Sequence, residues 1–154
     1  MIEIGEEDPT GADVVALIEA HRAFSLTITP PEHAYAMPPE QVAGSDLVLV
    51  GARESGQLLG VGALREFDAA TGEVKSMHTA AQARGRGVGR LVLEDLLARC
   101  RARGYHRVLL ETGSMEEMAA ARSLYESVGF ERRAPYGHYT ENGINLCYEL
   151  SLQG

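Results

Sequence analysis

Cysteine is scarce in this chain of 154 residues, which has only Cys100 and Cys147. This pair matches no metal-binding spacing, and Cys100 falls in a helical pattern where a small buried thiol is the ordinary expectation. Long hydrophobic runs are also absent: none approaches the roughly 20 residues that a membrane-spanning helix needs, and the amino terminus resembles no secretory signal. The sequence therefore predicts a cytoplasmic protein without a structural metal or a membrane span.

Positive charge is in short supply. Fourteen basic side chains stand against 22 acidic ones, and the net charge of −8 argues against general nucleic-acid binding. The deficit lies in residues 1–74, which carry a balance of −10, whereas residues 75–154 carry +2. Half of the basic residues fall in one short stretch: Arg84, Arg86, Arg90, Arg99, Arg101, Arg103 and Arg107. Such a local concentration in an acidic protein favours a small polyanionic ligand over a polymer.

The length and the apolar content of 45% predict a single folded domain over residues 1–154. Hydrophobic periodicity predicts an edge strand near the amino terminus, a helix, a three-strand meander, a second helix, a strand, a third helix and a final hairpin. The strands are expected at residues 2–4, 47–53, 57–67, 73–79, 107–111, 130–133 and 144–152, and the helices within residues 8–24, 91–103 and 115–128. This order predicts an α/β domain with a mixed, largely antiparallel sheet.

Two local patterns make finer predictions. In the strand at 73–79, simple alternation places Val74, Ser76 and His78 on one face. The stretch from Thr27 to Gly44 holds four of the six prolines, so we expect a loop with one short helix there. That loop, which includes His33, Tyr35 and Met37, is either a lid that sets specificity or a passive connection.

The most specific local feature is ARGRGVGR, residues 83–90, between a predicted strand and a predicted helix. Its three glycines permit unusual backbone geometry and leave N–H groups uncovered at a helix start, where the macrodipole favours anions. The segment is not a P-loop, because GxxxxGK[ST] is absent. It is not a dinucleotide fingerprint either, because Arg90 stands where a glycine or alanine is required. It therefore predicts a phosphate cradle of another kind.

This segment resembles the Q/R-x-x-G-x-G/A motif of the GNAT superfamily of N-acetyltransferases, through Arg84, Gly87 and Gly89. The run ARSLYESVGF at residues 121–130 is similar to the family's A-x-x-L-Y-x-x-x-G-F segment. The resemblance covers roughly residues 47–132 and implies a sheet of about six to seven strands flanked by about four helices. One position departs from the pattern: Met118 stands where the family often has an asparagine that contacts the cofactor.

The resemblance implies acetyl-CoA as cosubstrate. Its pyrophosphate would bind the amides of residues 84–89, and its pantetheine arm would pair with the strand at 73–79, which separates from the strand at 108–111. An N–H near Met77 or His78 would stabilise the oxyanion. The implied cofactor-binding residues are Met77, His78, Thr79, Arg84, Gly85, Arg86, Gly87, Val88, Gly89, Arg90 and Tyr125.

Acetylation of an amine requires one proton to leave the nucleophile and another to reach the CoA thiolate. Tyr125 resembles the family's general acid, although a tyrosine at this spacing also suits a core. Glu73 matches the position of a catalytic glutamate in several relatives, and otherwise is an ordinary strand carboxylate. Glu111 and His78 are further candidates for the base, and a water relay without any single base is a further alternative.

The implied reaction is direct acetyl transfer to a primary amine of a small molecule through a ternary complex. The alternatives are a non-catalytic sensor of acyl-CoA and a protein or peptide N-acetyltransferase. Tyr136, His138 and Tyr139 belong either to the acceptor pocket or to a surface turn. His21 and His33 are expected to be surface or loop residues rather than ligands. Many family members are dimers, so a homodimer is also compatible with the resemblance.

Overall fold

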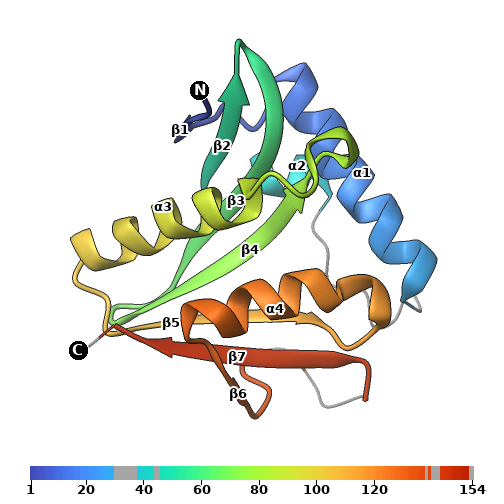
Figure 1. The fold of residues 1–154 in the computed structure, drawn as a ribbon. Coiled ribbons are helices and arrows are strands. Elements are labelled where there is room, and N and C mark those ends of the chain that lie inside the picture. The colour runs from blue at the N-terminus through green and yellow to red at the C-terminus, as the bar shows by residue number, and fades with distance from the viewer. Residues whose placement is uncertain (30–37, 44–45, 138, 140–142, 153–154) are drawn as a thin grey trace.

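The computed structural model describes residues 1–29, 38–43, 46–137, 139 and 143–152. Seven strands form one sheet in the order β1-β2-β3-β4-β5-β7-β6 (Figure 1). The strands are β1 (Glu3–Glu6), β2 (Val48–Glu54), β3 (Gln57–Asp68), β4 (Thr71–Thr79), β5 (Arg107–Gly113), β6 (Glu131–Arg133) and β7 (Asn145–Ser151). The helices are α1 (Ala12–Ile28), α2 (Pro39–Ala43), α3 (Val88–Ala102) and α4 (Ala119–Val128), with 3-10 turns η2 (Ala81–Ala83) and η3 (Glu116–Met118). The predicted α/β class with a mixed, largely antiparallel sheet is confirmed.

Glycines and short turns set the element boundaries as the sequence predicts. The β2–β3 hairpin closes through Ser55 and Gly56, whose φ angles of 52° and 82° suit the primed turn that matches strand twist. Helix α3 begins after Gly87 at φ 77°, and α4 ends at Gly129 at φ 114°. Both glycines adopt a left-handed conformation that costs other residues about 1–2 kcal/mol.

Helices cover both faces of the sheet. Leu93 and Leu96 of α3 pack with Val50 and Leu64 on one face, where α4 contributes Tyr125. On the opposite face a second cluster joins the amino-terminal helices to the strands and consists of Val14, Ile18, Val42, Leu49, Leu58, Val61 and Ala63. The buried residues of β2 and β3 are divided between these two clusters, so both strands are covered on both faces. Among the described residues, no helix is long and apolar enough to cross a membrane.

The parallel pair β4–β5 holds together over only part of its length. Residues 71–74 of β4 pair with residues 107–110 of β5, and no pairing continues beyond Val74 and Leu110. Past this point β4 still pairs with β3 as far as Thr79, and β5 still pairs with β7 as far as Gly113. The two strands thus stay anchored to their outer neighbours while they diverge from each other, and the separation expected from the family resemblance is present.

A β-bulge changes the faces of β4, so the prediction of simple alternation there is wrong. Ser76 has φ 56°, and the register with β3 shifts between Val61 and Ala63. A Cβ at Gly62 would lie 2.6 Å from Met77 Sδ and 2.7 Å from Val92 of α3, so Met77 faces the α3 side of the sheet, as Val74 does. His78 instead contacts His21 of α1 on the opposite side. A bulge adds one residue to the strand and reverses the alternation after it.

Some boundaries also differ from the sequence prediction. The helix expected from residue 115 begins at Ala119, because residues 116–118 form the tighter turn η3. The strand expected at 107–111 continues to Gly113, since β7 pairs with it throughout. Within the proline-rich stretch, α1 extends to Ile28 and α2 supplies the expected short helix. The rest of that stretch, with His33, Tyr35 and Met37, lies outside the described residues.

Candidate active site

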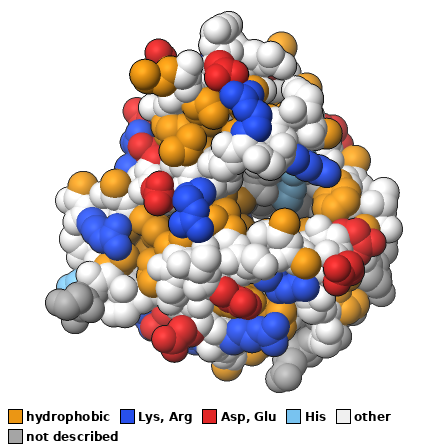
Figure 2. Space-filling model, viewed as in Figure 1, with side chains coloured by type: hydrophobic (Ala, Val, Ile, Leu, Met, Phe, Trp, Pro, Cys, Tyr) orange, Lys and Arg blue, Asp and Glu red, His pale blue; other side chains and the backbone are white. Residues whose placement is uncertain are grey.

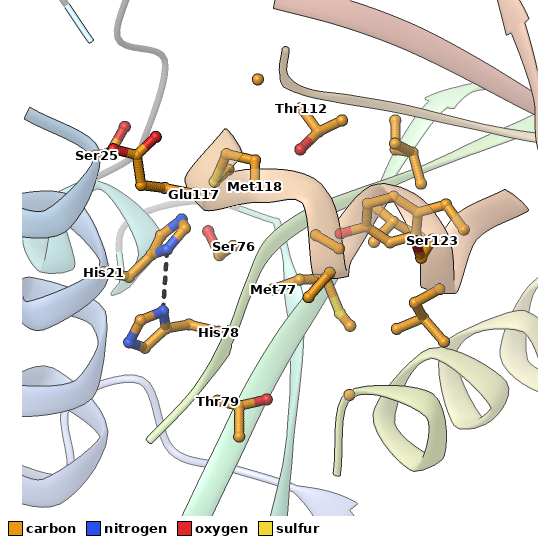
Figure 3. Close-up of a pocket in the computed structure, with 18 of the residues that line it drawn as sticks. His21, Ser25, Ser76, Met77, His78, Thr79, Thr112, Glu117, Met118 and Ser123 are labelled. Carbon is orange, nitrogen blue, oxygen red and sulfur yellow. Dashed lines mark hydrogen bonds between the residues drawn. The ribbon is translucent and has the colours of Figure 1, made fainter. Parts of the chain in front are cut away.

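The divergence of β4 and β5 opens a cleft with a volume of about 740 Å³. Its walls come from α1, the second half of β4, the glycine-rich start of α3, the end of β5 and α4. The turn before α4, Tyr139 and the start of β7 also contribute lining residues. Figure 2 shows the molecule hollowed here, with a histidine side chain on the floor, and Figure 3 shows the lining side chains. A cleft of this size holds a small-molecule ligand.

The glycine-rich segment forms one end of the cleft. Gly85 and Gly87 lie at φ 80° and 77°, and a Cβ at either position would meet no atom within 4 Å. No side chain caps the start of α3 at Gly87, so no side chain satisfies the first N–H groups of that helix. Gly89 allows α3 and α4 to approach closely, because a Cβ there would lie 3.3 Å from Leu124. This end of the cleft is therefore an open helix N-terminus suited to an anion.

The three arginines of this segment take different directions. Arg84 is exposed and lines the cleft. Arg90 also lines it, and its Nη2 donates a hydrogen bond of 2.6 Å to Ser127 Oγ on α4. Arg86 points toward the β2–β3 hairpin, where its Nη2 lies 2.8 and 2.9 Å from the two carboxylate oxygens of Glu54. Arg86 is thus the only one of the predicted cofactor-binding residues whose side chain does not line the described cleft.

The strand residues predicted to hold the pantetheine arm are also present in the cleft. Met77, His78 and Thr79 line it, and in the described structure no residue of β5 pairs with this part of β4. The edge of β4 that faces the divergence is therefore free to pair with a ligand. Met118, which departs from the family pattern, also lines the cleft and packs against Gly113, where a Cβ would lie 3.2 Å from Met118 Cγ.

Tyr125 and Glu111 lie together in the cleft on α4 and β5. Burial raises the pKa of Tyr125 and the nearby Glu111 raises it further, so the phenol stays protonated at neutral pH. Burial likewise raises the pKa of Glu111 to about 7, against an opposing influence of Lys75. At neutral pH the Tyr125 hydroxyl therefore carries its proton, whereas the pKa of the Glu111 carboxyl group lies close to neutral pH. The Tyr125 ring also packs at 6.0 Å from Phe130, so it fills the core as well.

Glu73 lies on the other face of β4 and does not line the cleft. It is fully buried, and four side chains surround its carboxylate. Arg65 Nη2 lies 2.7 Å from Oε1, and the hydroxyls of Tyr136 and Tyr139 donate to Oε2 at 2.6 and 3.2 Å. Lys75 Nζ lies 3.9 Å from the same Oε2. Tyr136 and Tyr139 are therefore buried partners of Glu73, rather than parts of a surface turn, and His138 between them lies outside the described residues.

The cleft also contains a histidine that sequence reasoning placed at the surface. His21 on α1 lies with its Nδ1 3.3 Å from Nδ1 of His78, as Figure 3 shows. A signal was available in the sequence, because His21 follows Val14 and Ile18 on the same stripe of the helix, and both of these are buried. Within the described part of the chain, no group of three or more His, Cys, Asp or Glu residues is placed to hold a metal.

Comparison with known proteins connects this geometry to one family. The model of the acetyltransferase (GNAT) family matches residues 15–130. YsnE of Bacillus subtilis, an uncharacterised N-acetyltransferase, is 40% identical over 88% of this chain and 90% of its own. A Klebsiella pneumoniae crystal structure, provisionally described as an acyl-CoA N-acyltransferase, has a TM-score of 0.81 at 29% identity, with 99% and 98% coverage. A GNAT family acetyltransferase of Elizabethkingia anophelis, solved with acetyl-CoA bound, shares the fold at a TM-score of 0.72, 18% identity and 98% coverage of both chains.

Proposed function

The chain belongs to the GNAT family of acetyltransferases, and on that premise we propose that it transfers an acetyl group from acetyl-CoA directly to a primary amine of a small molecule. The observation that carries this proposal is the separation of β4 from β5, which leads from the open helix N-terminus at Gly87 to Tyr125. An extended ligand with an anionic end and a reactive end fits a path of this kind.

Acetyl-CoA matches the chemistry of both ends. The pyrophosphate would accept hydrogen bonds from the first amides of α3, with Arg84 and Arg90 as neutralising charges. The pantetheine amides would pair with the unpaired edge of β4 at residues 77–79, as an added strand does. The thioester would then lie beyond Met77, where a β4 amide would stabilise the oxyanion.

Tyr125 would protonate the departing thiolate. A thiolate with a reference pKa of about 8.5 leaves slowly at neutral pH unless a proton or a strong hydrogen bond reaches it. Because burial raises its pKa, the Tyr125 hydroxyl carries a proton at neutral pH and could donate a strong hydrogen bond to the sulfur as it departs. Glu73 does not line the cleft, and its partner Tyr139 does, so Glu73 would act as a base only through intervening groups.

Direct transfer and an amine acceptor are each supported by the lining of the cleft. Neither Cys100 nor Cys147 is among the lining residues, and both are buried, so no cysteine is placed to carry an acetyl group between half-reactions. Glu117 lines the cleft and is exposed, so its carboxylate would attract an acceptor that arrives as a cation.

A thiol-release assay with acetyl-CoA across amines, amino acids, aminoglycosides and short peptides would test the proposal, together with calorimetry of CoA binding. We expect turnover with at least one small amine and intersecting double-reciprocal lines, which indicate a ternary complex. Parallel lines would indicate an acetyl-enzyme instead. CoA binding without turnover would make the protein a sensor, and turnover of peptides alone would make it a peptide acetyltransferase.

A further inference from the structure

Two histidines from distant parts of the chain meet inside the cleft. His21 of α1 and His78 of β4 have their Nδ1 atoms 3.3 Å apart, with the rings tilted by 49°. In Figure 3, His78 extends from the strand that carries Met77 and Thr79, whereas His21 lies on the side of Ser25 and Glu117. Both rings line the cleft, and the Glu117 side chain is exposed. The pair therefore connects β4, at the residue after Met77, with the α1 side of the cleft, where Glu117 is exposed.

A short contact between two Nδ1 atoms restricts the protonation of both rings. One Nδ1 must carry a hydrogen and the other must present its lone pair. Two neutral rings therefore adopt opposite tautomers, with one ring protonated at Nδ1 and the other at Nε2. Two protonated rings would direct two N–H groups at each other. The arrangement thus favours a neutral pair that is already connected by a hydrogen bond.

The surroundings also oppose a stored positive charge on the pair. Burial lowers the pKa of His21 to about 4. Burial lowers that of His78 to about 4 too, with smaller contributions from His21 and Arg84. The other charged or titratable side chains that line the cleft are Lys75, Arg90, Glu111, Glu117, Tyr125 and Tyr139. Because both pKa values are lowered, neither ring holds an extra proton at neutral pH. Such a pair suits the passage of a proton to water better than its storage.

We propose that His78 and His21 form a proton relay that carries the acceptor's proton from the reaction end of the cleft to solvent near Glu117, an inference that rests on the acetyl transfer proposed above. His78 takes the proton at Nε2 and passes its Nδ1 proton to Nδ1 of His21. His21 then releases its own Nε2 proton to water. Each ring gains one N–H bond and loses one, so neither keeps a charge, and exchange with water restores the first tautomers.

The test compares His21→Gln with wild type and with His106→Gln, a matched control at an exposed histidine outside the cleft. Glutamine keeps a polar group at position 21 but cannot pass a proton between two nitrogens. We expect kcat to fall by about 10- to 100-fold, which approaches the loss caused by removal of a general acid or base. The Kd for CoA should not change. The loss should be greatest at low pH and should shrink as the amine deprotonates in solution. His106→Gln should match wild type throughout.

Two further measurements keep the proposal falsifiable if His21→Gln folds poorly. In His21→Ala, added imidazole should restore turnover in proportion to its neutral form, whereas an equal concentration of its N-methyl derivative, which has no exchangeable N–H, should not. In wild type, nitrogen NMR of the rings should show opposite tautomers for His21 and His78 at pH 7, without reference to activity. Like tautomers, or rescue by both compounds, would overturn the relay.

Failure of the relay is distinguishable from failure of the proposed function. A wild-type protein that acetylates an amine while His21→Gln keeps its kcat and pH profile would overturn the relay and leave acetyl transfer standing. A wild-type protein that binds CoA but acetylates no amine would overturn both.

Discussion

Arg86 and Glu54 form a two-point ion pair that turns one arginine of the glycine-rich segment away from the cleft. Nη2 of Arg86 lies 2.8 and 2.9 Å from the two oxygens of Glu54, and the pairing lowers the pKa of that carboxyl group. Arg84, two residues earlier, lines the cleft instead. The two arginines thus form a matched pair for measuring what a side-chain charge contributes to cofactor binding.

We expect Arg84→Ala to weaken CoA binding by about 10-fold or more, because a charge-assisted hydrogen bond contributes roughly 1.5–3 kcal/mol. Arg86→Ala should change the affinity by less than about 3-fold, since only its long-range charge is lost. Calorimetry of CoA binding at fixed ionic strength would measure both. Equal losses in the two variants would show that general positive charge, and not the position of Arg84, determines the affinity.

Gly87 and Gly104 allow backbone strain to be separated from loss of the anion site. Their φ angles are 77° and 79°, and a Cβ at either position would meet no atom within 4 Å. Valine at either position should therefore cost a similar 1–2 kcal/mol of folding stability. Only Gly87→Val should also abolish CoA binding, because it changes the start of α3 in the cleft. A folded Gly87→Val protein with normal CoA affinity would refute the cradle assignment; thermal unfolding and calorimetry provide the two readouts.

The sequence predicted most of the elements because the signals for them are local. Periodicity located the meander and α3, and glycines marked the ends of α3 and α4 where left-handed backbone is needed. Local features also predicted that the glycine-rich segment binds a phosphate group, and the structure places this segment in the lining of the cleft. Where a residue's neighbours in the sequence determine its backbone conformation, a sequence pattern is sufficient to predict that conformation.

The rest depends on contacts that no local pattern contains. The bulge at Ser76 reverses the faces of β4 because Met77 packs over Gly62, which belongs to another strand. Glu73 leaves the cleft lining because Arg65, Tyr136 and Tyr139 surround it on the opposite face. His21 lines the cleft because α1 packs against β4 at His78. The only sequence signal for this placement is that His21 lies on the same stripe of α1 as the buried Val14 and Ile18.

Tyr125→Phe separates a catalytic role for the tyrosine from a packing role. The substitution removes the hydroxyl but keeps the ring that packs against Phe130. If Tyr125 protonates the CoA thiolate, kcat should fall by roughly 10² or more with little change in CoA affinity. Tyr105→Phe is the control, because the Tyr105 hydroxyl donates to Glu66 at 2.7 Å and does not line the cleft. Near-normal turnover of folded Tyr125→Phe, with chemistry rate-limiting, would leave the tyrosine a packing role only.

Glu111 should make folding stability depend on pH in a direction opposite to that of an ordinary surface carboxylate. Its pKa of about 7 in the folded state lies above its ordinary value of 4.5, chiefly because of burial, so the folded state binds more protons between these two pH values. The contribution of Glu111 to stability is therefore fully present below about pH 4.5 and is lost as the pH rises through 7. Above pH 8 the ionised carboxylate remains buried at a cost of at most roughly 3 kcal/mol.

Glu111→Gln removes this ionisation, so the variant should gain stability relative to wild type as the pH rises from 5 to 8. Glu117→Gln is the control, because Glu117 lines the same cleft but is exposed. Its stability difference from wild type should stay constant over this range within about 0.5 kcal/mol. Urea unfolding at pH 5, 6, 7 and 8 would measure both differences, and taking each against wild type at the same pH cancels the titration of the histidines. A flat difference for Glu111→Gln would mean that this carboxyl ionises at its ordinary pKa, and a difference that falls with rising pH would mean that its pKa is lowered; either result would contradict proton exchange by Glu111 near neutrality.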